Sequence, residues 1–123
     1  MSVYGLDFFR ILLYSKYMPT KNVKLVVFTP ISHADIVRKA LGEAGAGKIG
    51  NYDFCSFSSR GVGRFRGNEN SNPTIGKAGK YEEVEEERIE VTVPRDILEK
   101  VIRAMKKVHP YEEVAYDIYP IEN

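Results

Sequence analysis

The segment 97–108 has the clearest helical pattern in the chain, and it limits the folds that the chain can adopt. Its apolar residues recur three and four positions apart and share one face: Ile97, Leu98, Val101, Ile102, Met105 and Val108. Charged residues such as Glu99, Arg103 and Lys107 form the opposite face. Such a helix is stable when its apolar stripe packs against a second layer, and Pro110 prevents its continuation.

A second helix follows an apolar strand near the start of the domain. Residues 23–29 are rich in β-branched and aromatic side chains and end at Pro30, which predicts a mostly buried strand. Ser32 is placed to cap the next helix. The apolar residues of that helix recur at helical spacing: Ile36, Val37, Ala40, Leu41 and Ala44. We expect Gly45 and Gly47 to end it.

The middle of the chain has strand and turn patterns. Residues 52–57 are aromatic-rich and predict a strand, residues 58–61 predict a turn, and residues 62–66 predict a returning hairpin strand. The segment 67–80 is rich in Asn and Gly and predicts a long, functional or mobile loop. Alternation predicts further strands at 89–93, after an acidic run at 82–87, and at 114–119.

These elements predict an α+β ferredoxin-like β-α-β-β-α-β two-layer sandwich with an extended hairpin after the second strand. The chain has 123 residues, which fits one domain at 23–121 and an N-terminal extension at 1–22. Both helices need the same face of the sheet. The other face would expose apolar side chains, so we expect a homo-oligomer.

Charge and cysteine content exclude some functions. The formal net charge is +1, which gives no support for binding nucleic acid or a membrane surface. The single Cys55 and the lack of a signal peptide predict a cytoplasmic protein. The apolar stretch 3–13 is too short to span a bilayer, and we expect it to pack on the domain or on a neighbouring subunit. An amphipathic membrane anchor is the alternative.

Two glycine patterns are similar to nucleotide-binding motifs. Residues 42–49 match a P-loop except that Ile49 replaces the required Ser or Thr, and residues 45–50 match a dinucleotide fingerprint. Both motifs need a strand before the glycines and a helix after them. Here the helix comes first, so we interpret the glycines as a helix end and a tight turn.

Residues 109–113, which we call the closing segment, hold the densest group of polar side chains. With His33 and Cys55, they suggest a transition-metal site, in which the ligands would be His109, Glu112 and Glu113. Adjacent glutamates on a strand point to opposite faces and cannot both reach one metal. A purely structural role for the closing segment is therefore preferred, and a divalent metal ion stays an open alternative.

Three arginines form a second candidate site. Arg60, Arg64 and Arg66 lie close to Phe57 and Phe65, a mixture that can bind phosphate or carboxylate and stack on a ring. Tyr111 is a further candidate for ligand binding. The alternative is a charged edge that prevents wrong strand pairing. We expect the acidic run 82–87 to face the arginines across a subunit contact, and cation binding is the alternative. No nucleophile lies in a specific pattern with a base, which favours binding over catalysis.

Read together, residues 44–53, 55–57, 61–65 and 109–118 resemble the YqfO domain. This CutA-like and PII-like module is inserted in Nif-three-like proteins and also occurs alone, and we expect a stand-alone form here. The resemblance covers about Val23 to Ile121 and implies a ferredoxin-like fold that commonly forms trimers. In Nif-three-like proteins the flanking domains hold a two-metal site, and we expect a stand-alone domain to lack that site.

The resemblance and the residues leave three functional hypotheses. The first is an oligomeric small-ligand or ion binding, regulatory module whose ligand lies near the arginine hairpin and the closing segment. The second is CutA-like handling of divalent copper or zinc. The third is an accessory subunit that docks on a Nif-three-like metal-dependent hydrolase.

Overall fold

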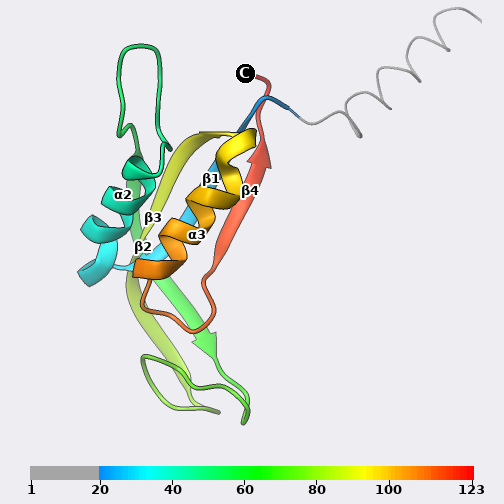
Figure 1. The fold of residues 1–123 in the computed structure, drawn as a ribbon. Coiled ribbons are helices and arrows are strands. Elements are labelled where there is room, and N and C mark those ends of the chain that lie inside the picture. The colour runs from blue at the N-terminus through cyan, green and yellow to red at the C-terminus, as the bar shows by residue number, and fades with distance from the viewer. Residues whose placement is uncertain (1–19) are drawn as a thin grey trace, which may run out of the picture.

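Four antiparallel strands form one sheet in the order β2-β3-β1-β4, and two helices cover one of its faces (Figure 1). The strands are β1 (Asn22–Pro30), β2 (Phe57–Arg66), β3 (Tyr81–Pro94) and β4 (Tyr116–Pro120). The helices are α2 (Ala34–Glu43) and α3 (Leu98–Val108), each preceded by a single 3-10 turn, η1 (Ile31–His33) and η2 (Arg95–Ile97). This order and topology confirm the predicted ferredoxin-like sandwich.

This computed structural model describes residues 20–123. The two predictions for the apolar stretch 3–13, packing on the domain or anchoring in a membrane, therefore lie outside the described residues. Within residues 20–123, no helix has both the length and the apolar character needed to cross a bilayer.

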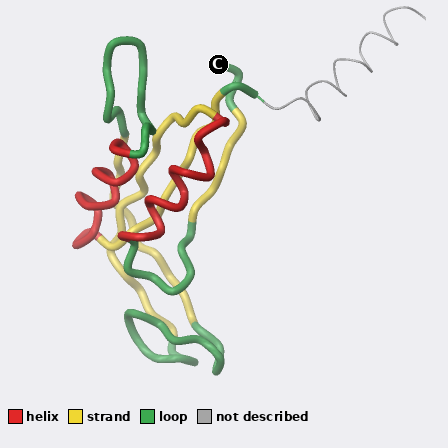
Figure 2. The backbone as a smooth tube through the Cα atoms, in the orientation of Figure 1, coloured by secondary structure: helices red, strands yellow, loops and turns green. Residues whose placement is uncertain are grey.

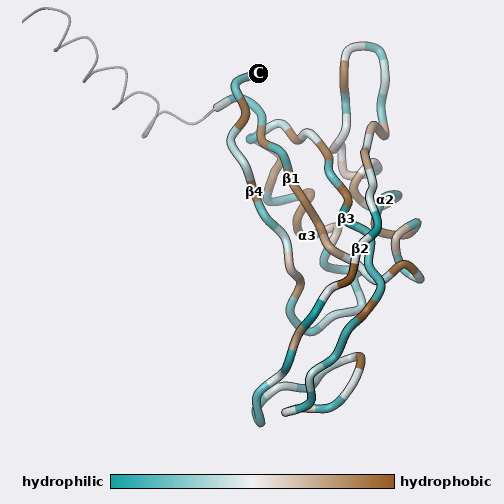
Figure 3. Tube along the Cα trace, turned by 180° about the vertical axis from the view of Figure 1, so that it is seen from behind, coloured by the Kyte–Doolittle hydropathy of each residue, from teal (hydrophilic) through white to brown (hydrophobic). Residues whose placement is uncertain are grey.

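The core lies between the sheet and the helices. Alternate residues of the two central strands point towards the helices and are buried: Val23, Leu25 and Val27 on β1, and Ile89, Val91 and Val93 on β3. They pack against Val37 and Leu41 of α2 and Val101 and Met105 of α3. Figure 3 shows the hydrophobic character of the middle of β1. Burial of each such side chain stabilises the fold by about 1.5–3 kcal/mol. The position of the core agrees with the apolar stripes predicted for the two helices.

The opposite face of the sheet is more polar than predicted. Strand alternation places Val26 and Phe28 on this face, and in the sheet register they lie beside Glu90, Asp117 and Arg88. Arg88 lies 6.0 Å from the ring of Phe28 and forms an ion pair with Glu90 at 2.9 Å. An apolar face alone is therefore a weak reason for oligomerisation, which stays a proposal.

The hairpin differs from the prediction. The predicted strand at 52–57 and turn at 58–61 are wrong, because β2 runs straight through residues 58–61 and pairs along its whole length with β3. The predicted acidic run is itself part of β3. In this register Arg60 is opposite Glu87 and Arg64 is opposite Glu83. Opposite charges across the strands favour this pairing over the local turn preference of Ser and Gly.

Residues 44–56, which connect α2 to β2, form a loop and not the predicted strand (Figure 2). The N–H of Gly47 donates to the carbonyl oxygen of Thr92 at 2.8 Å, and Gly47 has a φ of +80°. A side chain at this position would overlap the backbone of Cys55. The glycines therefore follow the end of α2, as predicted, and Gly47 also allows a close backbone contact that was not predicted.

The start of α2 also differs from the prediction. His33, not Ser32, is the residue before the helix, and no side chain caps the first turn. The hydroxyl of Ser32 lies 2.8 Å from Nδ1 of His33 instead. Ile36, which was expected on the apolar face, is 48% exposed.

Candidate ligand-binding pocket

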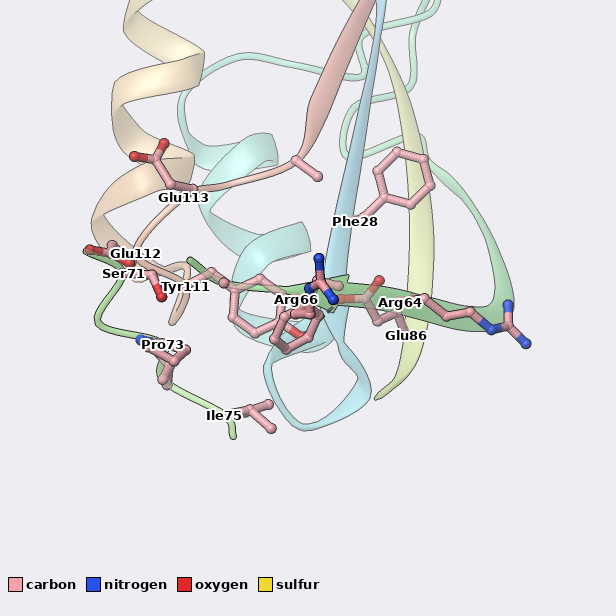
Figure 4. Close-up of a pocket in the computed structure, with 15 residues that line it drawn as sticks. Phe28, Arg64, Arg66, Ser71, Pro73, Ile75, Glu86, Tyr111, Glu112 and Glu113 are labelled. Atoms are coloured by element: carbon pink, nitrogen blue, oxygen red, sulfur yellow. Dashed lines mark hydrogen bonds between the residues drawn. The ribbon is translucent and has the colours of Figure 1, made fainter. Parts of the chain in front are cut away.

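A pocket of about 300 Å³ lies where the β2–β3 hairpin runs past the end of β1. It is lined by residues from β1, the hairpin, the loop 67–80 and the α3–β4 connection (Figure 4). Its apolar wall consists of Phe28, Phe65, Pro73, Ile75 and Ala115. Charged and hydroxyl groups complete it: Arg64, Arg66, Ser71, Thr74, Glu86, Tyr111, Glu112 and Glu113.

The loop 67–80 folds back onto the closing segment and forms one wall of the pocket. The hydroxyl of Thr74 donates to the carbonyl oxygen of Pro110 at 2.6 Å. The N–H of Asn72 donates to Oε2 of Glu112 at 3.0 Å. Both bonds are exposed, so each contributes little more than about 1 kcal/mol. The wall is therefore held in place weakly.

Tyr111 links the closing segment to the hairpin. Its hydroxyl donates to Oε2 of Glu86 at 2.9 Å, and its ring lies 6.1 Å from the ring of Phe65. Burial raises the pKa of Tyr111 above its ordinary value, and the hydrogen bond to Glu86 raises it further. Tyr111 thus stays protonated and remains a donor to Glu86.

His109, the first residue of the closing segment, is held in one tautomer. The N–H of Tyr111 donates to Nδ1 at 3.2 Å, so the ring proton must be on Nε2, which donates to the carbonyl oxygen of Phe28 at 2.7 Å. Burial lowers the pKa of His109, which keeps the ring neutral. Both ring nitrogens are used, and neither is free to bind a metal in this arrangement.

The three predicted arginines have different environments. Arg64 pairs with Glu83 at 3.3 Å and points away from the other lining side chains (Figure 4). Arg66 lines the pocket and forms no ion pair with any carboxylate of residues 20–123. Arg60 lines an adjoining hollow of about 280 Å³. Arg66 and Tyr111 therefore line the same pocket. Arg64 also lines it, but its guanidinium pairs with Glu83.

The predicted metal ligands are spread over the molecule. Glu112 and Glu113 line the pocket, in a bend before β4 and not on a strand as predicted. Cys55 lies in the loop 44–56, beside the far end of β3, and His33 lies in η1. Among residues 20–123, no three His, Cys, Asp or Glu side chains gather closely enough to hold a metal ion.

The acidic run pairs within the chain. Sequence reasoning expected it to face the arginines across a subunit contact, and this expectation is wrong for Glu83 and Glu87. Glu83 binds Arg64, and Glu87 binds Nη1 of Arg38 at 2.7 Å. Arg38, which the sequence analysis missed, also donates to the hydroxyl of Ser58 at 3.1 Å and pairs with Asp35. It ties α2 to the hairpin.

Sequence reasoning also missed Glu86, the acidic residue that contributes to the pocket from β3. Its side chain lies over Gly63, where any side chain would overlap Oε1 of the carboxylate. No local pattern distinguishes Glu86 from its acidic neighbours. Gly63 is the one signal that the sequence contained, because a glycine within a strand can mark a place where another group packs closely on the backbone.

No protein-family model matches the chain. It is 57% identical over 100 residues to a Halalkalibacterium halodurans protein named "GTP cyclohydrolase 1 type 2 homolog". That match covers 81% of this chain and 27% of the relative. A Bacillus subtilis protein of the same name is 52% identical over 99 residues, covering 80% of this chain and 26% of that protein.

Solved structures agree. A Bacillus cereus protein related to NIF3 has a TM-score of 0.71 at 52% identity, covering 85% of this chain and 26% of that one. The chain is thus similar to NIF3-related proteins over about a quarter of their length. The divalent cation tolerance protein CutA of Archaeoglobus fulgidus has a TM-score of 0.61 at 19% identity, covering 83% of this chain and 85% of CutA. This likeness confirms the CutA-like fold and supports nothing beyond the fold.

Proposed function

We propose that this domain is a small-ligand binding, regulatory module whose ligand carries an anionic group and occupies the pocket beside the closing segment. The observation that carries the proposal is Arg66, a residue that lines the pocket and whose guanidinium has no ion-pair partner among residues 20–123. Guanidinium groups bind carboxylate and phosphate through two parallel hydrogen bonds. The aromatic rings of Phe28 and Phe65 supply apolar contact for the rest of the ligand.

The weakly held loop 67–80 supports a regulatory role. It is attached to the closing segment by the exposed hydrogen bonds of Thr74 and Asn72. A ligand that contacts both the loop and Tyr111 would stabilise the closed arrangement and alter the surface that the hairpin end presents. We propose that other copies of the chain bind this surface in a homo-oligomer, and that the homo-oligomer is a trimer.

The relatives suggest where such a module acts. Their name refers to a GTP cyclohydrolase, but this chain matches only 26–27% of their length. We therefore transfer no reaction from them. We propose that the domain works next to the remaining parts of a Nif-three-like protein, either within one chain or as a docked subunit.

A thermal-shift panel tests the ligand proposal. It includes inorganic phosphate, dicarboxylates, GTP, ATP, Zn²⁺ and Cu²⁺, with the wild type, Arg66→Ala and Arg103→Ala. Arg103 is an exposed arginine on α3 that does not line the pocket, and it serves as the matched control. We expect an organic anion to stabilise the wild type by about 3 kcal/mol at one hundred times its dissociation constant. Arg66→Ala should lose this effect and Arg103→Ala should keep it.

Two outcomes would reject the proposal. If no anion stabilises the wild type, the pocket has no such ligand in the panel and the binding function fails. If only a metal ion stabilises it, and His109→Ala abolishes the effect, the CutA-like metal hypothesis replaces it. Native mass spectrometry of the same samples reports the subunit number, and a monomer at all concentrations would contradict the oligomeric part.

A further inference from the structure

Glu86 lies in the wall shared by the pocket and the adjoining hollow. Its two oxygens differ. Oε2 accepts the hydrogen bond from the hydroxyl of Tyr111, whereas Oε1 accepts none from residues 20–123. Among the described residues, no fully buried side-chain nitrogen or oxygen lacks a hydrogen-bond partner, so the unpaired Oε1 of the half-buried Glu86 keeps some contact with solvent. It is available to a ligand.

Two neighbours fix the position of this carboxylate. Gly63 has no side chain, which leaves the space that Oε1 occupies. Tyr111 holds Oε2 from the other side at 2.9 Å. A group held in this way loses little conformational entropy when it binds a ligand, so it can contribute strongly to specificity.

The same pocket contains the opposite charge. Arg66 and Glu86 both line it, yet they form no ion pair within 4.0 Å. Figure 4 draws both residues among those that line the pocket. A site that presents separate positive and negative groups between aromatic rings complements a molecule that carries both charges.

On the basis of the proposed function, we infer that the ligand is amphoteric. It carries an ammonium or other N–H donor that binds Oε1 of Glu86 and a carboxylate or phosphate that binds Arg66, joined by a small apolar or aromatic part. Glu86 is then the specificity-determining residue. A purely anionic ligand would displace water from this carboxylate without giving it a donor, which costs binding free energy.

Three probes with a common ring test this inference: phenylalanine, hydrocinnamate, which lacks the amino group, and phenethylamine, which lacks the carboxylate. Binding to ¹⁵N-labelled protein is followed through amide resonances of the closing segment and hairpin. We expect phenylalanine to bind the wild type about ten-fold more tightly than either analogue. Glu86→Gln, which keeps an acceptor for Tyr111, should remove the advantage over hydrocinnamate. Arg66→Ala should remove the advantage over phenethylamine.

Glu85→Gln is the matched control, because Glu85 is exposed on the same strand and does not line the pocket. It should keep the wild-type preference. Equal binding of phenylalanine and hydrocinnamate to the wild type would overturn the inference and leave the proposed anion site intact. An unchanged preference in Glu86→Gln would overturn it as well. The probes are added at up to about 10 mM, so that binding with a Kd in the millimolar range is detected. If none of the three probes moves a resonance, the inference is also rejected. The proposed function does not fail with this inference, because the thermal-shift panel tests that function separately.

Discussion

The hydroxyl of Tyr111 donates a hydrogen bond of 2.9 Å to Oε2 of Glu86, and so joins two residues that are 25 positions apart. This bond connects the closing segment to β3 at the point where the hairpin leaves the sheet. It belongs to a chain of contacts that continues through the N–H of Tyr111 to His109 and from His109 to the backbone of Phe28. The pocket wall is therefore tied to the central strand by polar contacts.

Tyr111→Phe removes this hydrogen bond and keeps the ring. We expect the free energy of unfolding to fall by about 1–2 kcal/mol, because the partly buried carboxylate of Glu86 loses its donor. Urea denaturation measures the change. Tyr119→Phe is the control, since Tyr119 is 48% exposed on β4, and it should change stability by less than about 0.5 kcal/mol. Equal effects of the two substitutions would contradict a specific role for the bond.

His109 makes the stability of the domain depend on pH. Its pKa is lowered in the folded state from the ordinary value of 6.5, chiefly by burial. The hydrogen bond to the carbonyl oxygen of Phe28 and the charge of Glu86 oppose this effect, and His33 adds a smaller lowering effect. The unfolded chain therefore binds the proton more readily. Stability from this residue is complete above about pH 6.5 and is lost as the pH falls towards the lowered pKa, at a slope of up to about 1.4 kcal/mol per pH unit.

Thermal unfolding of the wild type and His109→Gln across about pH 5 to 8 tests this expectation. Glutamine can still donate to the carbonyl oxygen of Phe28 but does not titrate. The variant should be less stable than the wild type at neutral pH and should lose less stability on acidification. Parallel curves for the two proteins would show that another group is responsible.

Gly47 and Gly79 form a matched pair for measuring steric overlap. Their φ angles are +80° and +81°, but a side chain would overlap the backbone of Cys55 at position 47 and would meet nothing within 4 Å at position 79. Gly79→Ala should cost about 1 kcal/mol, the price of the left-handed conformation alone. Gly47→Ala should cost at least about 2 kcal/mol more, because the loop 44–56 must shift. Urea denaturation compares them, and equal costs would refute the close approach.

We expect the partly buried Arg38 to contribute more to the stability of the fold than an exposed lysine does. Its partner Glu87 is only 9% exposed, and removal of the guanidinium leaves that carboxylate without its ion pair. We expect Arg38→Ala to destabilise the fold by about 2 kcal/mol. Lys39→Ala removes a pair with Glu43 in which both side chains are exposed, and should cost less than about 0.5 kcal/mol. Similar unfolding midpoints for the two variants would contradict this ranking.

Much of the fold could be predicted because it depends on local periodicity. The apolar stripe that includes Val101 and Met105 predicts α3, and the β-branched run from Val23 predicts β1, since spacing along the chain decides which face each side chain occupies. Gly45 and Gly47 mark the end of α2 for an equally local reason. The number and order of these elements then leave few arrangements besides the ferredoxin-like sandwich.

The hairpin could not be predicted in the same way. Residues 58–61 have the composition of a turn, but they extend in β2 because they pair with Glu87 and its neighbours in β3. Strand pairing depends on a partner more than twenty residues away, which local propensity does not describe. The separate environments of Arg64 and Arg66 follow from the same pairing, because Glu83 is within reach of Arg64.

The helices, the core and the glycine turn of this protein therefore follow from local sequence patterns, since each pattern depends on residues that are close together along the chain. The pocket depends on tertiary contacts instead. It placed Tyr111 against Glu86, left Oε1 of that carboxylate open above Gly63, and fixed both nitrogens of His109. These relationships join residues from four separate segments, and their geometry exists only after the sheet has formed.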